Sequence, residues 1–175
     1  MNIFVLDERP LVAAQYLDDV RVPKMIVESA QMLASALRRH GATDEEMPIA
    51  KTSGRPYKGG YKNHPCTIWA GNTSSNFAWL ALHGLGLCAE YTRRFGKVHA
   101  CESAIKHMIR MVDKIPAGIT EPFALAMDDE YKQENAVEAY RNYYFSKRES
   151  KGGVRYNRTT APLWWKERER ECSWS

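Results

Sequence analysis

Apolar residues recur at intervals of three and four along most of the chain, the spacing that places side chains on one face of an α-helix. The clearest case follows Pro23, where the apolar positions are Met25, Ile26, Met32, Leu33, Ala36 and Leu37. Gly41 supplies the stop signal that glycine gives at helix ends. The pattern predicts a helix from Pro23 to about His40.

The same signals predict helices over most of the remaining chain. They are expected at 10–18, 65–69, 74–95, 103–114 and 129–148, with a short one near the C-terminus. A short strand or extended start is expected at 3–6, a loop at 42–64 and a connector at 116–127. Because no βαβ alternation and no repeat occurs, we predict a single all-α domain over 1–175, with 151–175 as a tail packed on the body.

Composition limits the classes of protein to consider. The chain has 175 residues, 44% hydrophobic and 26% charged, as in an ordinary globular domain. No apolar run approaches the roughly 20 residues that cross a bilayer, and the apolar start is too short for a signal peptide. We therefore expect a cytoplasmic protein (the host cytoplasm if viral) with no membrane partner. Its four cysteines lack paired spacing and its histidines lack metal-ligand spacing, so no metal or cofactor is expected.

The loop before Pro65 has the composition of a nucleic-acid contact. Between Lys51 and His64 there are basic and aromatic side chains and no acidic residue. Phosphate attracts positive charge, and bases stack on aromatic rings. We predict that DNA is contacted by Tyr57, Lys58, Tyr61, Lys62 and Asn63.

A polar stripe marks the start of the helix that follows Pro23. Arg21, Lys24, Glu28 and Gln31 are spaced by three, four and three residues, which places them on one face. A lysine and a glutamate four apart also form ordinary surface pairs. Because the stripe combines a phosphate-type arginine, an amine and a carboxylate near a helix N-terminus, we predict that it belongs to a site, with Lys24 and Glu28 catalytic and Arg21 and Gln31 contacting DNA.

Three further polar residues each have a functional and a structural interpretation. His64, at a helix entrance, is either a donor in catalysis or a cap. Asn76, on an apolar helix face, either faces a pocket or ties helices together. Arg141, among tyrosines, either reaches phosphate or packs. We include His64 among the catalytic candidates, and Asn76 and Arg141 among the nucleic-acid contacts.

Short segments in order along the chain look like those of small bacteriophage-type proteins and, more distantly, resemble the pyrimidine-dimer DNA glycosylases. The segments are Val5–Asp7, Ala14–Tyr16, Pro23–Leu33, Asn63–Pro65, Ile68–Trp69, Asn76–Leu80, Glu90–Tyr91 and Phe95–Lys97. The resemblance implies an all-α fold in which an N-terminal amine attacks a deoxyribose and a glutamate on the second helix supports the reaction. It also implies that Arg21 and Lys24 grip the DNA backbone around an extruded base.

Two positions depart from the family's pattern. The family's glutamate directly follows its arginine, whereas Val22 stands there in this chain and Glu28 is the nearest candidate. Asn2 is too large for efficient removal of Met1. The leading hypothesis is therefore a DNA-acting enzyme of bacteriophage type, either glycosylase-like in DNA repair or a base-modifying transferase. The alternatives are a non-catalytic nucleic-acid-binding or accessory interaction protein, and an enzyme acting on free nucleotides. Oligomeric state is left open.

Overall fold

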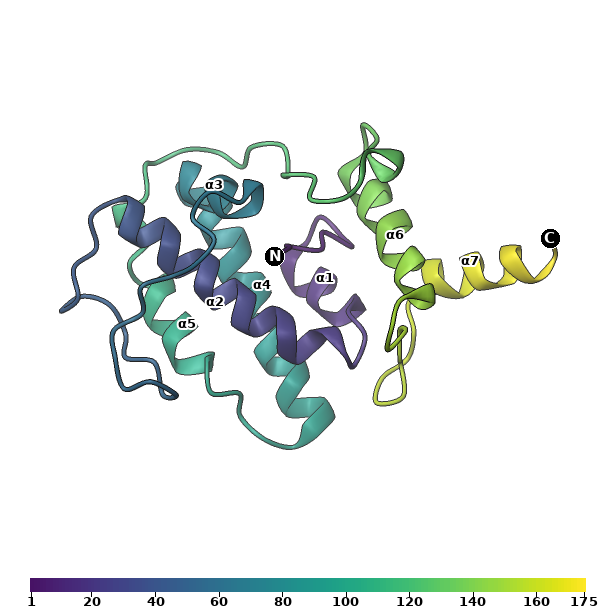
Figure 1. Cartoon of the computed structure of the whole chain (residues 1–175), viewed down its shortest axis with the longest axis horizontal. Coiled ribbons are helices and arrows are strands. Elements are labelled where there is room, and N and C mark those ends of the chain that lie inside the picture. The colour runs from purple at the N-terminus through teal and green to yellow at the C-terminus, as the bar shows by residue number, and fades with distance from the viewer.

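Helices form where the apolar spacing predicts them, and no strand forms anywhere in the computed structural model, which describes residues 1–175 (Figure 1). The all-α prediction is confirmed. The α-helices are α1 (Pro10–Tyr16), α2 (Arg21–Arg39), α3 (Pro65–Asn72), α4 (Ser74–Phe95), α5 (Glu102–Ile109), α6 (Ala136–Ser146) and α7 (Leu163–Ser173). Three short 3-10 turns are η1 (Val112–Lys114), η2 (Asp129–Tyr131) and η3 (Lys147–Glu149).

Local capping explains which helix boundaries the sequence predicts well. Helix α4 spans the predicted residues because Thr73 Oγ1 accepts a hydrogen bond from the Asn76 N–H at its start and Gly96 ends it with φ of 71°. Helix α2 begins two residues before Pro23, since the Asp18 carbonyl accepts from the N–H groups of Arg21 and Val22. The predicted helix 129–148 is instead η2, α6 and η3, with a break before Asn135, which caps α6.

Helices α2 and α4 form the centre of the fold. Helix α4 packs on α1, α2, α3 and α5, and α2 also packs on α3 and α5. Figure 1 shows α6 and α7 on the other side of the N-terminal segment, reached by a connector that crosses over the top of the molecule. The apolar face of α2 is fully covered, including Ile26, Leu33 and Leu37. No helix is both long and apolar enough to span a bilayer.

The N-terminal segment is buried between these two parts, and the expectation of a strand there is wrong. Residues 3–6 pair with no other strand. They are held instead by Asn2, whose Oδ1 accepts from the N–H groups of Ile3 and Phe4 at 2.8 Å each. Its Nδ2 donates to the Ala126 carbonyl at 2.8 Å. Because Ile3 and Phe4 are buried as well, the position of the first residue is well defined.

The C-terminal tail is anchored by aromatic rings only as far as Trp165. Trp164 and Trp165 are buried and lie edge-on to Tyr144 on α6. Beyond them α7 extends away from the body, and Trp174 is 88% exposed. The part of the tail that packs on the body is therefore shorter than the predicted 151–175.

A network of buried charges joins α4 to the corner between α1 and α2. Arg94 donates to Glu90 at 2.9 Å, to the Leu17 carbonyl at 2.7 Å and to Asp19 at 3.3 Å. Burial by itself would raise the pKa of Glu90, but hydrogen bonds from Arg93 and Arg94 outweigh it and lower that pKa. Asp19 also accepts from backbone N–H groups of the tail, so this network fixes the corner where α2 begins.

Candidate active site

The α-amino group of Met1 and the carboxylate of Glu28 meet in the structure. The nitrogen lies 2.9 Å from Glu28 Oε1, and the Met1 and Glu28 side chains are 2% and 14% exposed. Glu28 is on the third turn of α2, and the Asn2 hydrogen bonds hold the N-terminal segment across that helix. An amine and a carboxylate separated by 28 positions are thus brought into direct contact by the fold.

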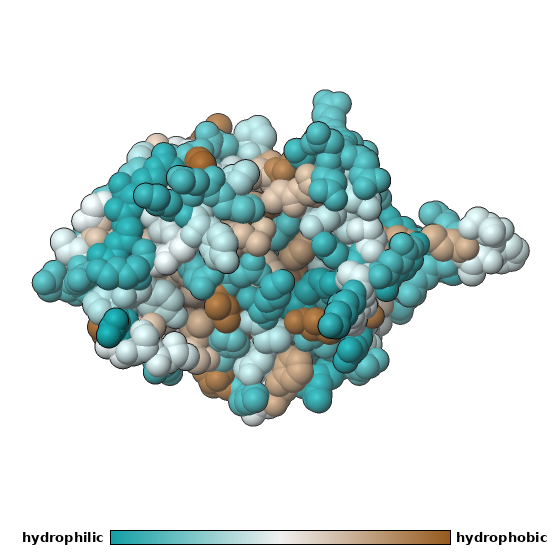
Figure 2. Space-filling view, viewed as in Figure 1, coloured by the Kyte–Doolittle hydropathy of each residue, from teal (hydrophilic) through white to brown (hydrophobic).

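This pair lies in a cleft of about 310 Å³ built from three segments. The N-terminal segment and the first two turns of α2 form one wall, and the end of α6 with η3 and the residues after it forms the other. The lining residues are Met1, Asn2, Phe4, Arg21, Lys24, Met25, Glu28, Tyr143, Lys147, Ser150 and Lys151. Figure 2 shows the surface hollowed between the part that carries α3 and the part that carries α6, with hydrophilic side chains on both sides.

The cleft carries more positive than negative charge. Arg21, Lys24, Lys147 and Lys151 line it together with the amine, and Glu28 is the single carboxylate in the lining. Lys24 is exposed and forms no ion pair. Lys147 Nζ donates to Tyr143 Oη at 2.8 Å and lies over that ring. An anionic ligand is therefore attracted to the cleft, because a concave surface lined by one sign of charge concentrates its potential.

Arg21 is less available than Lys24. Its Nη1 donates to Asp18 Oδ1 at 3.1 Å and to the Gly153 carbonyl at 3.0 Å. Its guanidinium also lies over the Tyr144 ring, and its side chain is 12% exposed. Arg21 therefore ties α2 to the tail and adds positive charge to the cleft wall. Gln31, the last member of the predicted stripe, is half-buried and lies outside the cleft lining.

His64 lies close enough to this pair for both charges to act on it. Its Nδ1 accepts from the Cys66 N–H at 3.1 Å, so it does cap α3. Since a backbone N–H can only donate, the neutral ring carries its proton on Nε2. Burial and the nearby positive α-amino group lower the pKa of His64, and Glu28 opposes this weakly. At neutral pH the ring is thus uncharged, with an N–H to offer.

An amine, a carboxylate and a neutral imidazole in one basic cleft form a set suited to nucleophilic chemistry. The amine can attack an electrophilic carbon after the carboxylate takes its proton. α-Amino groups in general hold their proton less tightly than lysine side chains, which favours the nucleophilic form near neutral pH. No group of three or more histidine, cysteine, aspartate or glutamate side chains is placed to hold a metal ion.

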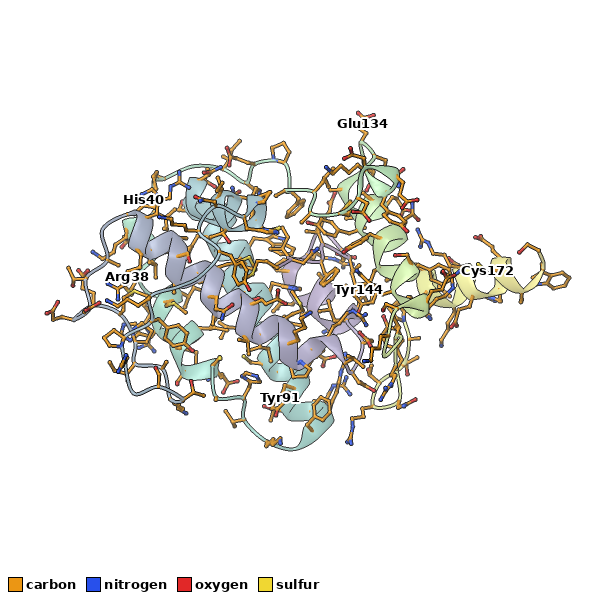
Figure 3. All side chains as sticks on the ribbon, viewed as in Figure 1. Arg38, His40, Tyr91, Glu134, Tyr144 and Cys172 are labelled. Atoms are coloured by element: carbon orange, nitrogen blue, oxygen red, sulfur yellow. The ribbon has the colours of Figure 1, made fainter.

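The loop residues predicted to contact DNA separate into two groups. Tyr57 is half-buried, with its Oη 3.5 Å from Cys101 Sγ and its carbonyl accepting from Arg38. Figure 3 shows Arg38 on the side of α2 toward this loop. The other group, Lys58, Tyr61, Lys62 and Asn63, lines a second groove that shares no residue with the cleft. The structure therefore turns Tyr57 toward the interior and leaves the other group at the surface.

Asn76 and Arg141 take the structural interpretation that each allowed. Asn76 is fully buried; its Nδ2 donates to the Trp69 carbonyl and to Glu121, and its Oδ1 accepts from the Glu121 N–H. Arg141 Nε donates to the Leu6 carbonyl at 2.9 Å, and its guanidinium lies over Trp164. Asn76 is thus inaccessible to a ligand, and Arg141 fastens α6 to the N-terminal segment.

The departure at Val22 also has a structural explanation. Val22 is fully buried in the core, so this position cannot present a carboxylate to the cleft. Glu28, nearly two turns further along α2, reaches the amine instead. Tyr143, Lys147 and Lys151 complete the cleft from the C-terminal part of the chain, and no motif in the sequence indicated them.

The fold and the cleft are those of a helical protein that presents its N-terminal amine and a helix-borne carboxylate to an anionic ligand. The pyrimidine dimer DNA glycosylase family matches residues 1–103, which is more than half of the chain. The protein therefore belongs to that family. The matched residues include Met1, Lys24, Glu28 and His64, whereas the wall from α6 and η3 lies beyond them. No curated protein and no solved structure matches the chain.

Proposed function

We propose that this protein is a DNA glycosylase-type enzyme whose nucleophile is the α-amino group of Met1. The observation that carries the proposal is the 2.9 Å contact between this amine and Glu28 inside a basic cleft. Membership of the pyrimidine dimer DNA glycosylase family supports DNA as the substrate and makes a pyrimidine dimer the first lesion to test.

The chemistry begins with proton transfer from the ammonium of Met1 to Glu28, which frees the nitrogen lone pair. The amine attacks C1′ of the target deoxyribose as the bond from C1′ to the base breaks, and the base leaves with that electron pair and gains a proton. Opening of the sugar ring and loss of a second amine proton convert the new bond into an imine. Water then hydrolyses the imine, which regenerates the amine and leaves an abasic sugar.

The remaining cleft residues have roles that follow from their positions. Lys24, exposed and without an ion pair, binds a backbone phosphate beside the target sugar. His64 donates its Nε2–H to the departing base or to a phosphate, because its lowered pKa keeps the ring neutral with that proton in place. A sugar inside a duplex reaches the cleft only if its nucleotide is extruded, at a cost of a few kcal/mol that is smallest for a damaged base.

Reductive trapping tests this mechanism directly. The protein is incubated with cyanoborohydride and a duplex that contains one pyrimidine dimer, and undamaged duplex serves as the control. Cyanoborohydride reduces an imine to a stable amine, so we expect a covalent protein–DNA adduct whose attachment maps by peptide mass spectrometry to residue 1. Attachment to Lys24 instead would reject the α-amine as nucleophile.

Two matched variants sharpen this test. A short extension placed before Met1 converts its amine to an amide and should abolish trapping, whereas the same extension after Ser175 should leave it unchanged. Glu28→Gln keeps the size of the side chain and removes the proton acceptor, so trapping should slow strongly while DNA affinity changes little. If both variants trap as fast as the unaltered protein, the site is misplaced.

The same reaction mixtures distinguish the other functions. Nucleoside mass spectrometry after complete digestion would detect a modified base if the protein is a base-modifying transferase, and a released base if it is a glycosylase. A non-catalytic DNA-binding protein would yield neither product, and an enzyme of free nucleotides would alter mononucleotides but not the duplex.

A further inference from the structure

A second basic groove lies between the C-terminal half of α2 and the end of the loop 42–64. Its volume is about 610 Å³, within the range of pockets that hold a small molecule. The lining residues are Ser35, Ala36, Arg38, Arg39, Lys58, Gly59, Gly60, Tyr61, Lys62, Asn63 and Thr67. They include four cations and no carboxylate. We propose that this groove is a second nucleic-acid site, which binds the phosphate of a nucleotide and stacks its base on Tyr61.

An unpaired polar residue in the lining indicates a ligand. Thr67 is 3% exposed, and its Oγ1 has no hydrogen-bond partner. Its backbone N–H, in the first turn of α3, donates to no group in the protein either. Burying a hydroxyl without a partner costs free energy, and N–H groups at helix starts attract anions. Both groups of Thr67 are satisfied together by a phosphate oxygen in the groove.

The cations differ in how far the protein already uses them. Arg38 donates to the carbonyls of Tyr57 and Ala42 and to Asp44, so its guanidinium is occupied. Lys62 is exposed and forms no ion pair. Lys58 pairs with Asp44, but both side chains are more than half exposed, so a phosphate can compete for this lysine. Lys58 and Lys62 are therefore the cations most available to a ligand.

The wall of the groove is built in advance of binding. Gly59 has φ of 87° and lies so close to α2 that a Cβ there would fall 2.3 Å from Ser35 Oγ. Ser35 Oγ accepts from the Gly60 N–H and donates to the Gly60 carbonyl, both at 2.8 Å. The next residue, Tyr61, also has positive φ, at 53°, and is 67% exposed. This backbone directs the Tyr61 ring into solvent, where a base can stack on it.

The groove and the amine cleft lie along the same face of α2. Glu28 and Ser35 are seven residues apart, which is two helical turns, or about 10 Å along the axis. The outer pair Lys24 and Arg38 is about 21 Å apart on the same measure. A DNA strand advances about 3.4 Å per nucleotide in a duplex, so the two sites are about three to six nucleotides apart on one strand. The inference thus rests on the proposed function only for the assumption that DNA is the polyanion.

Binding measurements with matched charge variants test the groove. The double variant Lys58→Gln/Lys62→Gln removes two charges from the lining, and Lys51→Gln/Arg55→Gln removes two from the tip of the same loop, outside it. The probe is a dye-labelled single strand of about twelve nucleotides, followed by fluorescence anisotropy over a range of salt concentrations. We expect the lining variant to weaken binding about tenfold and to reduce the salt slope by about 0.7 per lost contact, and the tip variant to do much less. Equal effects of the two variants would overturn the proposal.

Thr67→Val is the decisive substitution, because valine keeps the shape and removes only the hydroxyl. We expect binding of the same probe to weaken about fivefold while the melting temperature stays unchanged or rises, since an unpaired buried hydroxyl has been removed. If affinity is unaltered, the hydroxyl touches no ligand and the proposal is wrong.

Competition by thymidine 5′-monophosphate identifies the source of the phosphate. Competition as strong as that of the oligonucleotide, and lost in Thr67→Val, assigns the groove to free nucleotides. Weak competition assigns it to a DNA strand. None of these readouts depends on imine formation, and the groove variants retain Met1 and Glu28. Failure of the groove and failure of the glycosylase mechanism are therefore separately observable.

Discussion

Two groups of charged side chains flank the start of α2, and they are built in opposite ways. In the group around Arg94, the guanidinium is almost fully buried and bonded to Glu90, Asp19 and two carbonyls, and only its Nε lacks a partner. In the cleft, one carboxylate faces the Met1 amine and several cations. The first group has its charges balanced within the protein. The second has surplus positive charge directed at solvent.

This contrast separates structural charge from functional charge better than residue type does. Sealing ions in a low-dielectric interior is favourable only when each is paired and hydrogen-bonded, so a completed network indicates a structural role. Cations without partners in a concave surface instead indicate an anionic ligand. By this criterion the cleft and the groove on α2 are sites, and the arginines at 94 and 141 are parts of the framework.

The largest effect expected is that of Glu28→Gln on the rate of reductive trapping. Because the amide cannot take a proton from the Met1 amine, the rate should fall about 100- to 10,000-fold. Single-turnover trapping with saturating DNA measures it, and Lys24→Ala serves as a control that should mainly weaken binding. A rate for Glu28→Gln within a few-fold of the unaltered protein would place the cleft among the structural charges.

The balanced network should respond in the opposite manner. Arg94→Leu leaves Glu90 and Asp19 without their buried partner, so unfolding free energy should fall by about 3–5 kcal/mol. Arg93 pairs with the same Glu90 but is 54% exposed, and Arg93→Leu should cost less than about 1 kcal/mol. Urea denaturation measures both. Similar losses from the two variants would contradict the distinction between the buried and the exposed pair.

Acid should weaken the framework through a buried histidine on α4. Burial lowers the pKa of His83 to about 4, against a smaller opposing effect of its hydrogen bond to the Pro10 carbonyl. The unfolded chain binds this proton near pH 6.5 and the folded chain only near pH 4. Stability is therefore complete above pH 6.5 and falls by about 3 kcal/mol as pH drops to 4.

Urea denaturation across that window tests the assignment. His83→Gln, which can still donate to the Pro10 carbonyl, should show a flatter dependence between pH 6.5 and 4. An unchanged slope would assign the acid sensitivity to other groups.

The smallest effect expected is that of removing single hydroxyls from α6. Tyr144 Oη donates to the buried carboxylate of Asp18 at 2.5 Å and accepts from its N–H, so Tyr144→Phe should cost about 1–3 kcal/mol. Figure 3 shows Tyr144 on the side of α6 toward the body. The neighbouring Tyr143 lines the cleft and bonds to Lys147, so Tyr143→Phe should alter trapping more than stability. Thermal unfolding and trapping rates together test this pair, and a reversed ranking would place Tyr143 in the framework.

Much of the local structure was determined by the sequence itself. The apolar spacing, the proline at the start of α3 and the Thr73 and Gly96 caps predict helix type and several boundaries, because these preferences depend on residues within one or two turns. The basic loop and the Lys24–Glu28 stripe were also visible, since charge composition and helical periodicity are local properties.

Only the tertiary structure decided which of these residues meet. Periodicity places Glu28 on a face of α2, but the Asn2 hydrogen bonds and the core around Phe4 bring the Met1 amine to it. The lysines after α6 reach the same cleft by contacts across more than 100 residues, and Tyr57 and Asn76 turn inward for packing that no local pattern encodes. The physical reason is that side-chain spacing specifies a face, whereas burial and hydrogen bonding between distant segments specify what that face meets.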